Sequence, residues 1–150
     1  MRALVVGASL SAGLLAGGCG SGSDHLSKDE YVKKFKAASQ QALTEGRASA
    51  GTTQPTAGAD RAAAVLRRLA GRIAGLKAPK EVEEPQDQFV SALRSQATEL
   101  DQAAAAYRSG NKKPLETIER RGGPSKDVAE REDKALEEFK EKGYRVATLD

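Results

Sequence analysis

Apolar side chains recur every three or four residues along most of the chain, which is the spacing of amphipathic α-helices, and no segment alternates apolar and polar residues as a strand does. The first stretch of this kind predicts a helix from Lys28 to Glu45. Ser27 followed by Glu30 is the pattern of a capping box at its start, and Gly46 is a typical helix end.

The next two stretches predict two further helices. One runs from Asp60 to Leu76, and Pro79 stops it because proline cannot continue a helix. The other has the clearest periodicity in the chain and ends at residues 109–111. It begins either at Pro85 or near Lys80, in which case the proline lies in the first turn.

The C-terminal part of the chain predicts a broken helical arm. Residues 114–119 start a short helix, the Gly-Gly-Pro run at 122–124 interrupts it, and Ser125 caps a last helix that ends at Gly143. The apolar residues of the tail, 144–149, are expected to fold back onto the bundle. The whole pattern predicts an all-α, up-down helical bundle of about four main helices, with its last arm broken near 122–124.

Residues 46–59 interrupt the helical pattern. They consist mainly of Gly, Ser, Thr, Pro and Ala and show no periodicity, which is typical of a loop. A loop of this length is uncommon in a compact domain and is either functional or disordered. We therefore expect a mobile loop between the first two helices, and its composition favours disorder.

The first 18 residues have a different character. Arg2 is followed by an apolar stretch, and small residues lead up to Cys19, the only cysteine of the chain. This order is typical of a secretory signal peptide, whereas a membrane-spanning helix needs about 20 strongly apolar residues. The enzymes that attach lipid to a cysteine sulfur and cut before it need small residues there, and Gly18 meets this need. We therefore expect residues 1–18 to be a lipoprotein signal peptide, cleaved after Gly18, with Cys19 lipidated.

An ordinary signal peptide, cut elsewhere and with Cys19 as a bystander, is the alternative, because Ala16 stands where lipoprotein signals most often have Leu. Two acyl chains give stable anchoring, so lipidation would hold the protein on the extracytoplasmic face of the cell membrane, or on an outer membrane if the cell has one. Residues 19–25, rich in Gly and Ser, are then the lipidated cysteine and a flexible tether, and residues 26–150 form the helical bundle domain. His25, the only histidine, is expected to be a solvated residue of this tether.

The composition argues against several classes of function. The chain has 24 basic and 21 acidic side chains, a formal net charge of +3, and the predicted cleavage removes Arg2 from this balance. A nucleic-acid binder usually has a stronger basic excess and aromatic side chains for stacking, but only 4% of these residues are aromatic and none is Trp. No motif joins a nucleophile to a base, and no phosphate loop or zinc spacing occurs. We predict a protein without catalytic residues, cofactor or nucleic-acid partner.

Arginines on the second predicted helix form a candidate site for an anionic ligand. Together with Lys77 they offer positive charge to anionic lipid headgroups or cell-wall polymers. The other interpretation, which the sequence favours, is a solvated face whose charges are interspersed with acidic neighbours from the third predicted helix. The arginines of this candidate site are Arg61, Arg67, Arg68 and Arg72.

Acidic residues gather at the start of the third predicted helix, at Glu81, Glu83, Glu84 and Asp87. They lack the alternating spacing and the glycine of a calcium loop, and the helix dipole already explains acidic residues at this position. We therefore expect no metal site. A catalytic pair of carboxylates stays open at the level of sequence, although no residue points to one.

The last predicted helix is rich in charge. Its spacing predicts i,i+4 ion pairs between Glu130 and Lys134 and between Glu138 and Lys142. These pairs are typical of a helix surface and do not indicate acid–base catalysis.

Three short motifs carry a resemblance to a known kind of protein. They are LSKDEYV at 26–32, which follows the lipidation motif and the Gly/Ser linker, LKAP at 76–79, and KGYRV at 142–146. In this order they resemble small uncharacterised lipoproteins of actinobacterial type, which open their helical domain with a Leu-Ser-Lys-x-Glu-Phe pattern. The resemblance covers most of residues 26–147. It implies the location of the protein in the cell envelope and its fold, but no activity.

Many of these lipoproteins have one cysteine in the first helix and another in the final tail. By position these cysteines correspond to Ser39 and Ala147 here, so the resemblance implies that a disulfide has been lost as a unit. A bridge of this kind usually contributes about 2–4 kcal/mol, which this chain lacks.

These observations predict a membrane-anchored extracytoplasmic lipoprotein that acts as a non-enzymatic binding or structural module of the cell envelope. Its partners would be the membrane, through a lipid on Cys19, and an unknown envelope protein or polymer. The alternative is a binder of anionic lipid or cell-wall polymer that uses the arginine-rich helix face.

Overall fold

The computed structural model describes residues 25–49 and 54–146. Within these two ranges the chain is entirely helical apart from its connections, and no strand occurs, so the predicted all-α fold is confirmed. The elements are α1 (Lys28–Ser49), α2 (Pro55–Ala74), the short 3-10 helix η1 (Lys80–Val82), α3 (Glu83–Arg108), α4 (Lys113–Arg121) and α5 (Lys126–Glu141).

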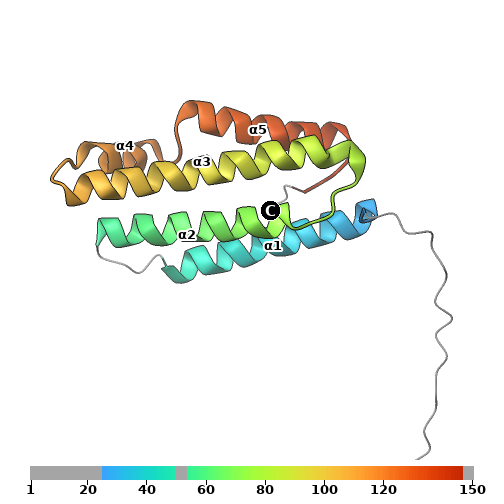
Figure 1. Ribbon diagram of the computed structural model, residues 1–150, viewed down its shortest axis with the longest axis horizontal. Coiled ribbons are helices and arrows are strands. Elements are labelled where there is room, and N and C mark those ends of the chain that lie inside the picture. Colours follow the sequence, from blue (N-terminus) through green and yellow to red (C-terminus); the bar gives the residue numbers. More distant parts are fainter. Residues whose placement is uncertain (1–24, 50–53, 147–150) are drawn as a thin grey trace, which may run out of the picture.

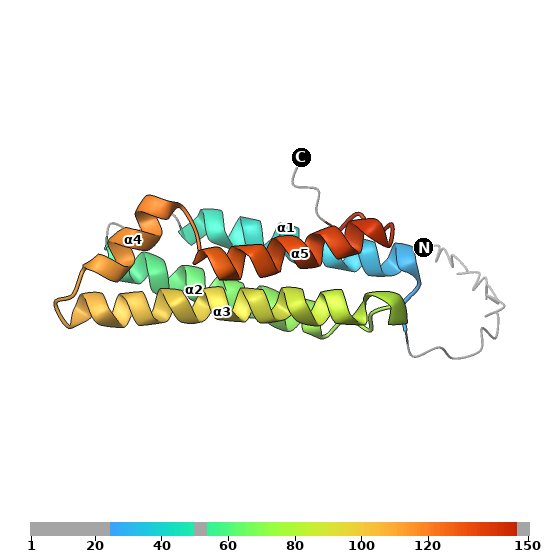
Figure 2. The same ribbon diagram turned by 90° about the horizontal axis from the view of Figure 1, so that it is seen from above.

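The long helices run up and down, as predicted. In Figure 1, α2 and α3 form the central pair, with α1 beside α2 and α5 beside α3. Figure 2 shows α1 and α5 displaced to the same side of that pair, with α4 set at an angle at one end of the bundle. None of the helices in the described ranges combines the length and the apolar character that crossing a membrane requires.

The predicted loop at 46–59 is wrong at both ends. Helix α1 continues through Gly46 to Ser49, and α2 already begins at Pro55. A glycine inside a helix costs only about 1 kcal/mol, and a proline in the first turn fits the helix because its missing N–H would be unpaired there. The loop therefore shrinks to residues 50–54, of which 50–53 lie outside the described residues.

The capping box predicted at the start of α1 is confirmed. The Ser27 hydroxyl donates to Oε2 of Glu30 at 2.8 Å, and the backbone N–H of Glu30 reaches Oγ of Ser27 at 3.4 Å. The hydrogen bond from the Ser27 side chain lowers the pKa of the Glu30 carboxyl, and the bond from the Ser27 backbone adds to this. The beginning of the first helix is therefore set by local sequence alone.

The start of α3 combines the two alternatives that the sequence left open. Residues 80–82 form the single turn of η1, and the α-helix proper begins at Glu83, so that Pro85 lies in its first turn. The backbone N–H of Val82 donates to the Pro79 carbonyl at 2.9 Å. This connection turns the chain from α2 into α3.

The break between α4 and α5 is confirmed. Gly122 ends α4 with a φ of 74°, a left-handed conformation that suits glycine. Ser125 is the N-cap of α5, but its side chain makes no bond to its own helix. Instead its hydroxyl donates to Glu99 of α3, and its backbone N–H donates to the other carboxylate oxygen of Glu99 at 2.8 Å. The broken arm is thus fastened to the centre of α3.

The main core is an aromatic cluster at the end of the bundle where α1 begins and α5 ends. Phe35 lies 5.4 Å from Phe89 and 5.5 Å from Phe139, measured between ring centroids, and Tyr31 lies 5.9 Å from Tyr144. These five residues, which we call the aromatic cluster, include all three phenylalanines of the chain. Most of the few aromatic side chains of this protein are thus concentrated in one place, where they join α1, α3, α5 and the tail.

The tail folds back, as predicted, over the residues that the structure describes. Tyr144 and Val146 are buried, and the Tyr144 hydroxyl donates to Oε1 of Glu81 at 2.6 Å. Residues 147–149 of the predicted tail lie outside the described residues.

A buried polar chain beside the aromatic cluster links α1, α3 and the connection between α2 and α3. The Tyr31 hydroxyl donates to Oε1 of Gln86 at 2.8 Å, and Nε2 of Gln86 donates to the Leu76 carbonyl at 3.2 Å. Gln86 is only 6% exposed, so both ends of its amide need a partner. These hydrogen bonds fix the relative positions of α1, α3 and the connection that follows α2.

Candidate functional site

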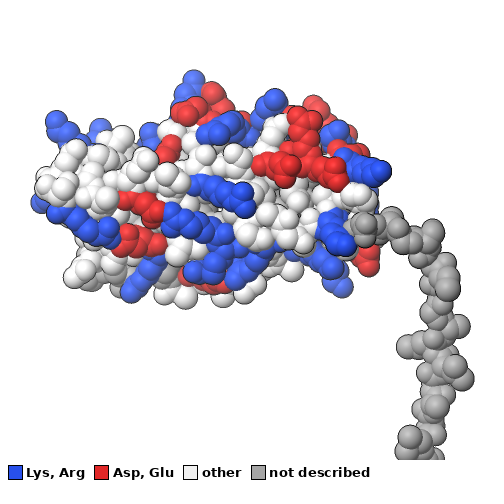
Figure 3. All heavy atoms as spheres, viewed as in Figure 1, with Lys and Arg blue, Asp and Glu red and all other residues white. Residues whose placement is uncertain are grey.

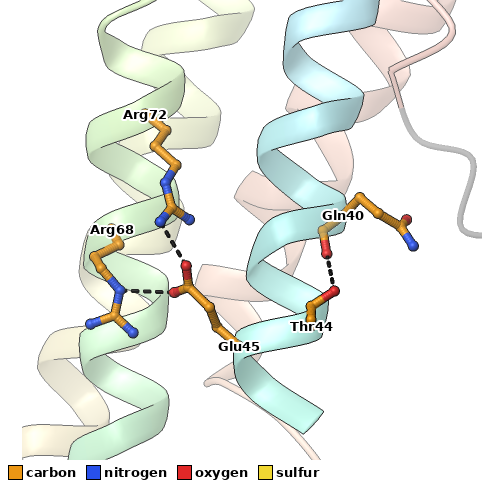
Figure 4. Close-up of polar contacts among 5 residues, drawn as sticks. All are labelled: Gln40, Thr44, Glu45, Arg68 and Arg72. Carbon is orange, nitrogen blue, oxygen red and sulfur yellow. Dashed lines mark hydrogen bonds and ion pairs between the residues drawn. The ribbon is translucent and has the colours of Figure 1, made fainter. Parts of the chain in front are cut away.

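The predicted lipidation site, with Gly18 and Cys19, lies outside the described residues. The predicted arginine site on α2 is described, and its side chains pair with carboxylates. Figure 4 shows Arg68 and Arg72 of α2 reaching across to Glu45 of α1. Nε of Arg68 lies 2.8 Å from one carboxylate oxygen of Glu45, and Nη2 of Arg72 lies 2.6 Å from the other.

The pair with Glu45 has an electrostatic signature. Hydrogen bonds from Arg72 and then from Arg68 lower the pKa of the Glu45 carboxyl. The sequence predicted acidic neighbours from α3 only, because Glu45 was assigned to the last residue of a helix that in fact continues for another turn. Glu45 of α1 contacts the C-terminal half of α2, where it pairs with Arg68 and Arg72.

The other two arginines differ from each other. Arg67 pairs with Asp101 of α3, which agrees with the predicted acidic neighbours from that helix. Arg61 is exposed on the first half of α2. On the face that Figure 3 shows, Lys and Arg side chains are interspersed with Asp and Glu. The structure therefore brings Arg67, Arg68 and Arg72 into ion pairs that join α1, α2 and α3.

The acidic residues near the start of α3 also have structural partners. Glu81 accepts the hydrogen bond from Tyr144, which lowers the pKa of Glu81, while burial and this bond raise the pKa of Tyr144 to about 12. Glu84 accepts a hydrogen bond from Nε2 of Gln88 at 3.2 Å. Across residues 25–49 and 54–146 there is no group of three or more His, Cys, Asp or Glu that could hold a metal ion.

His25 is not the solvated tether residue that the sequence predicted. Its Nδ1 atom lies 2.5 Å from the Ala78 carbonyl oxygen and 3.5 Å from Oε1 of Glu83, and its side chain is 30% exposed. The next residue is held as well, because the backbone N–H of Leu26 donates to the Lys77 carbonyl at 2.8 Å. The folded domain therefore includes His25, which docks on the connection between α2 and α3.

The ion pairs predicted along α5 form with different partners. Glu130 pairs with Lys126 at 3.4 Å, and Glu138 pairs with Lys134 at 3.7 Å. Each glutamate thus pairs with the lysine one turn before it, whereas the prediction used the lysine one turn after it. Both arrangements have i,i+4 spacing, so the sequence pattern alone does not choose between them.

The sequence did not reveal an apolar groove of about 800 Å³ that the structure shows between α1 and α5. Its floor is formed by α2 and α3, and its walls are α1 and α5. We call it the α1–α5 groove. Its apolar lining includes Leu43 of α1, Leu66 and Leu69 of α2, Phe89 and Leu93 of α3, and Leu136 of α5.

The groove exists because α1 and α5 meet at one end only. At the aromatic cluster, Phe35 and Phe139 close the space between them, and Nζ of Lys28 lies 3.5 Å from the Lys142 carbonyl oxygen. Further along, leucines of α2 and α5 pack against the core but stay partly exposed, among them Leu66 and Leu136. In a closed four-helix bundle such inward-facing positions are covered by the neighbouring helices. Here one side of the bundle is left open.

A few polar side chains stand on the walls of the groove. Lys36 and Arg47 belong to α1, and Glu132 belongs to α5. None of the three has a hydrogen bond or ion pair with another residue in the described ranges, in contrast to Arg67, Arg68 and Arg72. Burial raises the pKa of the Glu132 carboxyl, and the negative charge of Asp133 adds to this.

One signal in the sequence points toward the groove. The last helix of the bundle has 16 residues, whereas α1 has 22, so the fourth wall is shorter than the first. The Gly-Gly-Pro break, which was predicted, separates this short helix from α4. The apolar residues of α1, however, have the same spacing whether a neighbouring helix covers them or not, so the open side itself was not predictable from the sequence.

Comparison of the chain with protein-family models, with curated proteins and with solved structures finds no significant match.

Proposed function

We propose that the protein is a lipid-anchored, non-enzymatic binding module of the cell envelope, and that the α1–α5 groove is its binding surface for an elongated apolar ligand. The observation that carries this proposal is the groove itself. Its volume of about 800 Å³ lies within the usual range of small-molecule sites, and such sites combine an apolar lining with a few polar groups.

The proposed lipid anchor at the cell membrane is supported by the first 19 residues, whose charged, apolar and small residues follow one another as in a lipoprotein signal peptide. Mass spectrometry of the protein from a membrane fraction tests it. We expect a chain that begins at Cys19 and carries a diacylglyceryl group on the sulfur. An unmodified Cys19, or a chain that retains Met1, would contradict the lipid anchor but would leave the groove as a binding surface.

A binding role rather than catalysis is supported by the chemistry of the groove. Its lining contains one carboxyl group, that of Glu132, and neither a histidine nor a cysteine. A pair of carboxylates, or a nucleophile next to a base, is the usual minimum for the reactions that such side chains catalyse.

The arginine face of α2 is the second candidate, as a surface for anionic lipid or cell-wall polymer. The ion pairs of Arg67, Arg68 and Arg72 argue for a structural role, because a ligand would have to displace Asp101 and Glu45. Binding to anionic polymer that weakens with salt and is lost in the double variant R67A/R68A would favour this candidate over the groove.

The groove is tested with a neutral apolar dye, N-phenyl-1-naphthylamine, whose fluorescence rises in an apolar site. The purified chain should bind the dye, and Leu66→Gln should weaken binding at least tenfold because it places an amide in the floor of the groove. The matched control is Leu100→Gln, since Leu100 is also a partly buried leucine but packs in the second, smaller core near α4. Equal affinity of the two variants would contradict the groove as the binding surface.

A further inference from the structure

We infer that the ligand of the α1–α5 groove is a single-chain amphiphile with a carboxylate headgroup, whose hydrocarbon chain lies along the groove and whose carboxylate binds the ammonium group of Lys36. The inference rests on the proposed function of the groove and goes beyond it by naming the ligand chemistry. It is carried by the shape of the apolar floor and by the charge at its rim.

The length of the groove fits a hydrocarbon chain. Along α1 its wall runs from Phe35 to Arg47, which at about 1.5 Å per residue is roughly 18 Å. A carbon–carbon bond of about 1.5 Å in an extended zigzag advances roughly 1.25 Å, so about 14 carbons span this distance. Gly46 adds room near the far end, because a Cβ atom there would meet nothing within 4 Å.

Lys36 is the cation that a headgroup would need. It is partly buried at the end of the groove where Phe35 closes it, and it makes no ion pair or hydrogen bond with another residue of the described part of the chain. Its ammonium group offers the positive charge that a carboxylate headgroup needs, and no carboxylate of the described residues already pairs with it.

Arg47 offers a comparison within the same wall. It is exposed and lies in the last turn of α1, where a positive side chain is already stabilised by the helix dipole. Glu132 faces the middle of the groove, between the two ends. Burial raises the pKa of this carboxyl, and the negative charge of Asp133 adds to this.

A chain-length and headgroup series tests the inference, with displacement of the neutral dye from the purified chain as the measurement. Saturated fatty acids of increasing length should bind about fourfold more tightly per added methylene, and the gain should stop near 14 carbons. Tetradecanoate should bind at least tenfold more tightly than tetradecanol, and more tightly still than tetradecyltrimethylammonium. Equal binding of the three, or a gain that continues well beyond 14 carbons, would overturn the inference.

Two matched variants locate the headgroup. Lys36→Gln should bring the affinity for tetradecanoate down to that for tetradecanol and leave the alcohol unchanged, whereas Arg47→Gln should alter neither. Equal effects of the two variants would overturn the role of Lys36. If the dye still binds and Leu66→Gln still prevents dye binding, equal effects of the two variants contradict the headgroup assignment only. If neither the dye nor the amphiphile binds, the proposed function of the groove is contradicted as well.

Other occupants of the groove give distinct results. An amphipathic helix of a partner protein would bind through apolar area without a preference for carboxylate over alcohol in the competition series. A second copy of this chain would give a dimer in analytical ultracentrifugation that tetradecanoate does not dissociate. Either result would overturn the amphiphile as the natural ligand.

Discussion

Glu132 carries a carboxyl group into an apolar groove without a partner to balance its charge. It makes no ion pair within the described ranges, and its pKa is raised by burial first and by Asp133 second. Glu45 of α1 is the opposite case, because hydrogen bonds from Arg72 and Arg68 hold the pKa of its carboxyl below the usual value of 4.5. The two glutamates therefore affect stability with opposite dependence on pH.

We expect Glu132→Gln to stabilise the protein at neutral pH. Because the folded pKa lies above the unfolded one, the free energy of unfolding falls as the pH rises from 4.5 through the folded pKa, and stays lower above it. Glutamine removes this loss, which after allowance for solvent screening is under about 1 kcal/mol. Thermal unfolding should show a higher Tm for the variant at pH 7 and the same Tm as the wild type near pH 4. A lower Tm at pH 7 would mean that the charge has a favourable partner.

Glu45→Gln is expected to act in the other direction. The lowered pKa of Glu45 means that its contribution is present above pH 4.5 and is lost as the pH falls through the folded pKa below that value. The variant should therefore have a reduced Tm at pH 7, and the difference should vanish in acid. Glu137→Gln is the control, because Glu137 is an exposed glutamate of α5 that has no ion pair with a described residue. A Glu45 variant that behaves like this control would contradict the pairing with Arg68 and Arg72.

At the scale of elements, the helices follow from local signals where these signals are strong. The capping box at Ser27 and the left-handed glycine at 122 set helix ends that were predicted correctly. The region 46–59 failed because small residues and Pro were interpreted as breakers, although Pro is favoured in the first turn of a helix. His25 was assigned to the tether because no sequence pattern reports a contact with residues more than fifty positions away.

The break between α4 and α5 depends on one glycine more than on its neighbour. Gly122 has a φ of 74° and Gly123 does not share this left-handed conformation, while a Cβ atom would meet nothing within 4 Å at either position. Gly122→Ala should therefore cost about 1 kcal/mol from backbone strain, and Gly123→Ala should be close to neutral. Urea unfolding of the two variants measures this difference. Equal losses would show that φ at 122 is not what limits the turn.

At the scale of the whole molecule, the sequence predicted the all-α bundle but not its open side. Bundle and groove are built from the same apolar stripes, and the difference lies in whether α5 is long enough and close enough to cover Leu43 and Leu66. The arginines on α2 were a candidate site for an anionic ligand because they cluster in the sequence, yet the carboxylates that pair with Arg67 and Arg68 come from α3 and α1. A cluster of one charge in sequence is not a cluster in space until the facing helices are known.

The two ends of α5 should therefore contribute very differently to stability. Phe139 is fully buried in the aromatic cluster, 5.5 Å from Phe35 and 6.1 Å from Tyr31, whereas Leu136 lines the groove and is partly exposed. Phe139→Ala should cost about 3–5 kcal/mol, a large share of the total for a small domain, while Leu136→Ala should cost roughly 1–2 kcal/mol because less of its surface is removed from water.

Urea unfolding measures these two losses. If the free energy of unfolding falls with urea concentration at the same slope in both variants, the shift of each midpoint gives the loss of stability. A cost for Leu136→Ala as large as that for Phe139→Ala would mean that Leu136 is fully covered in solution, and that the groove is closed in the absence of a ligand. The smaller cost is expected to grow when tetradecanoate is added, because the bound chain buries Leu136 and the truncated side chain forfeits that contact. The ligand-dependent part of the difference then reports directly on how much of the groove the amphiphile covers.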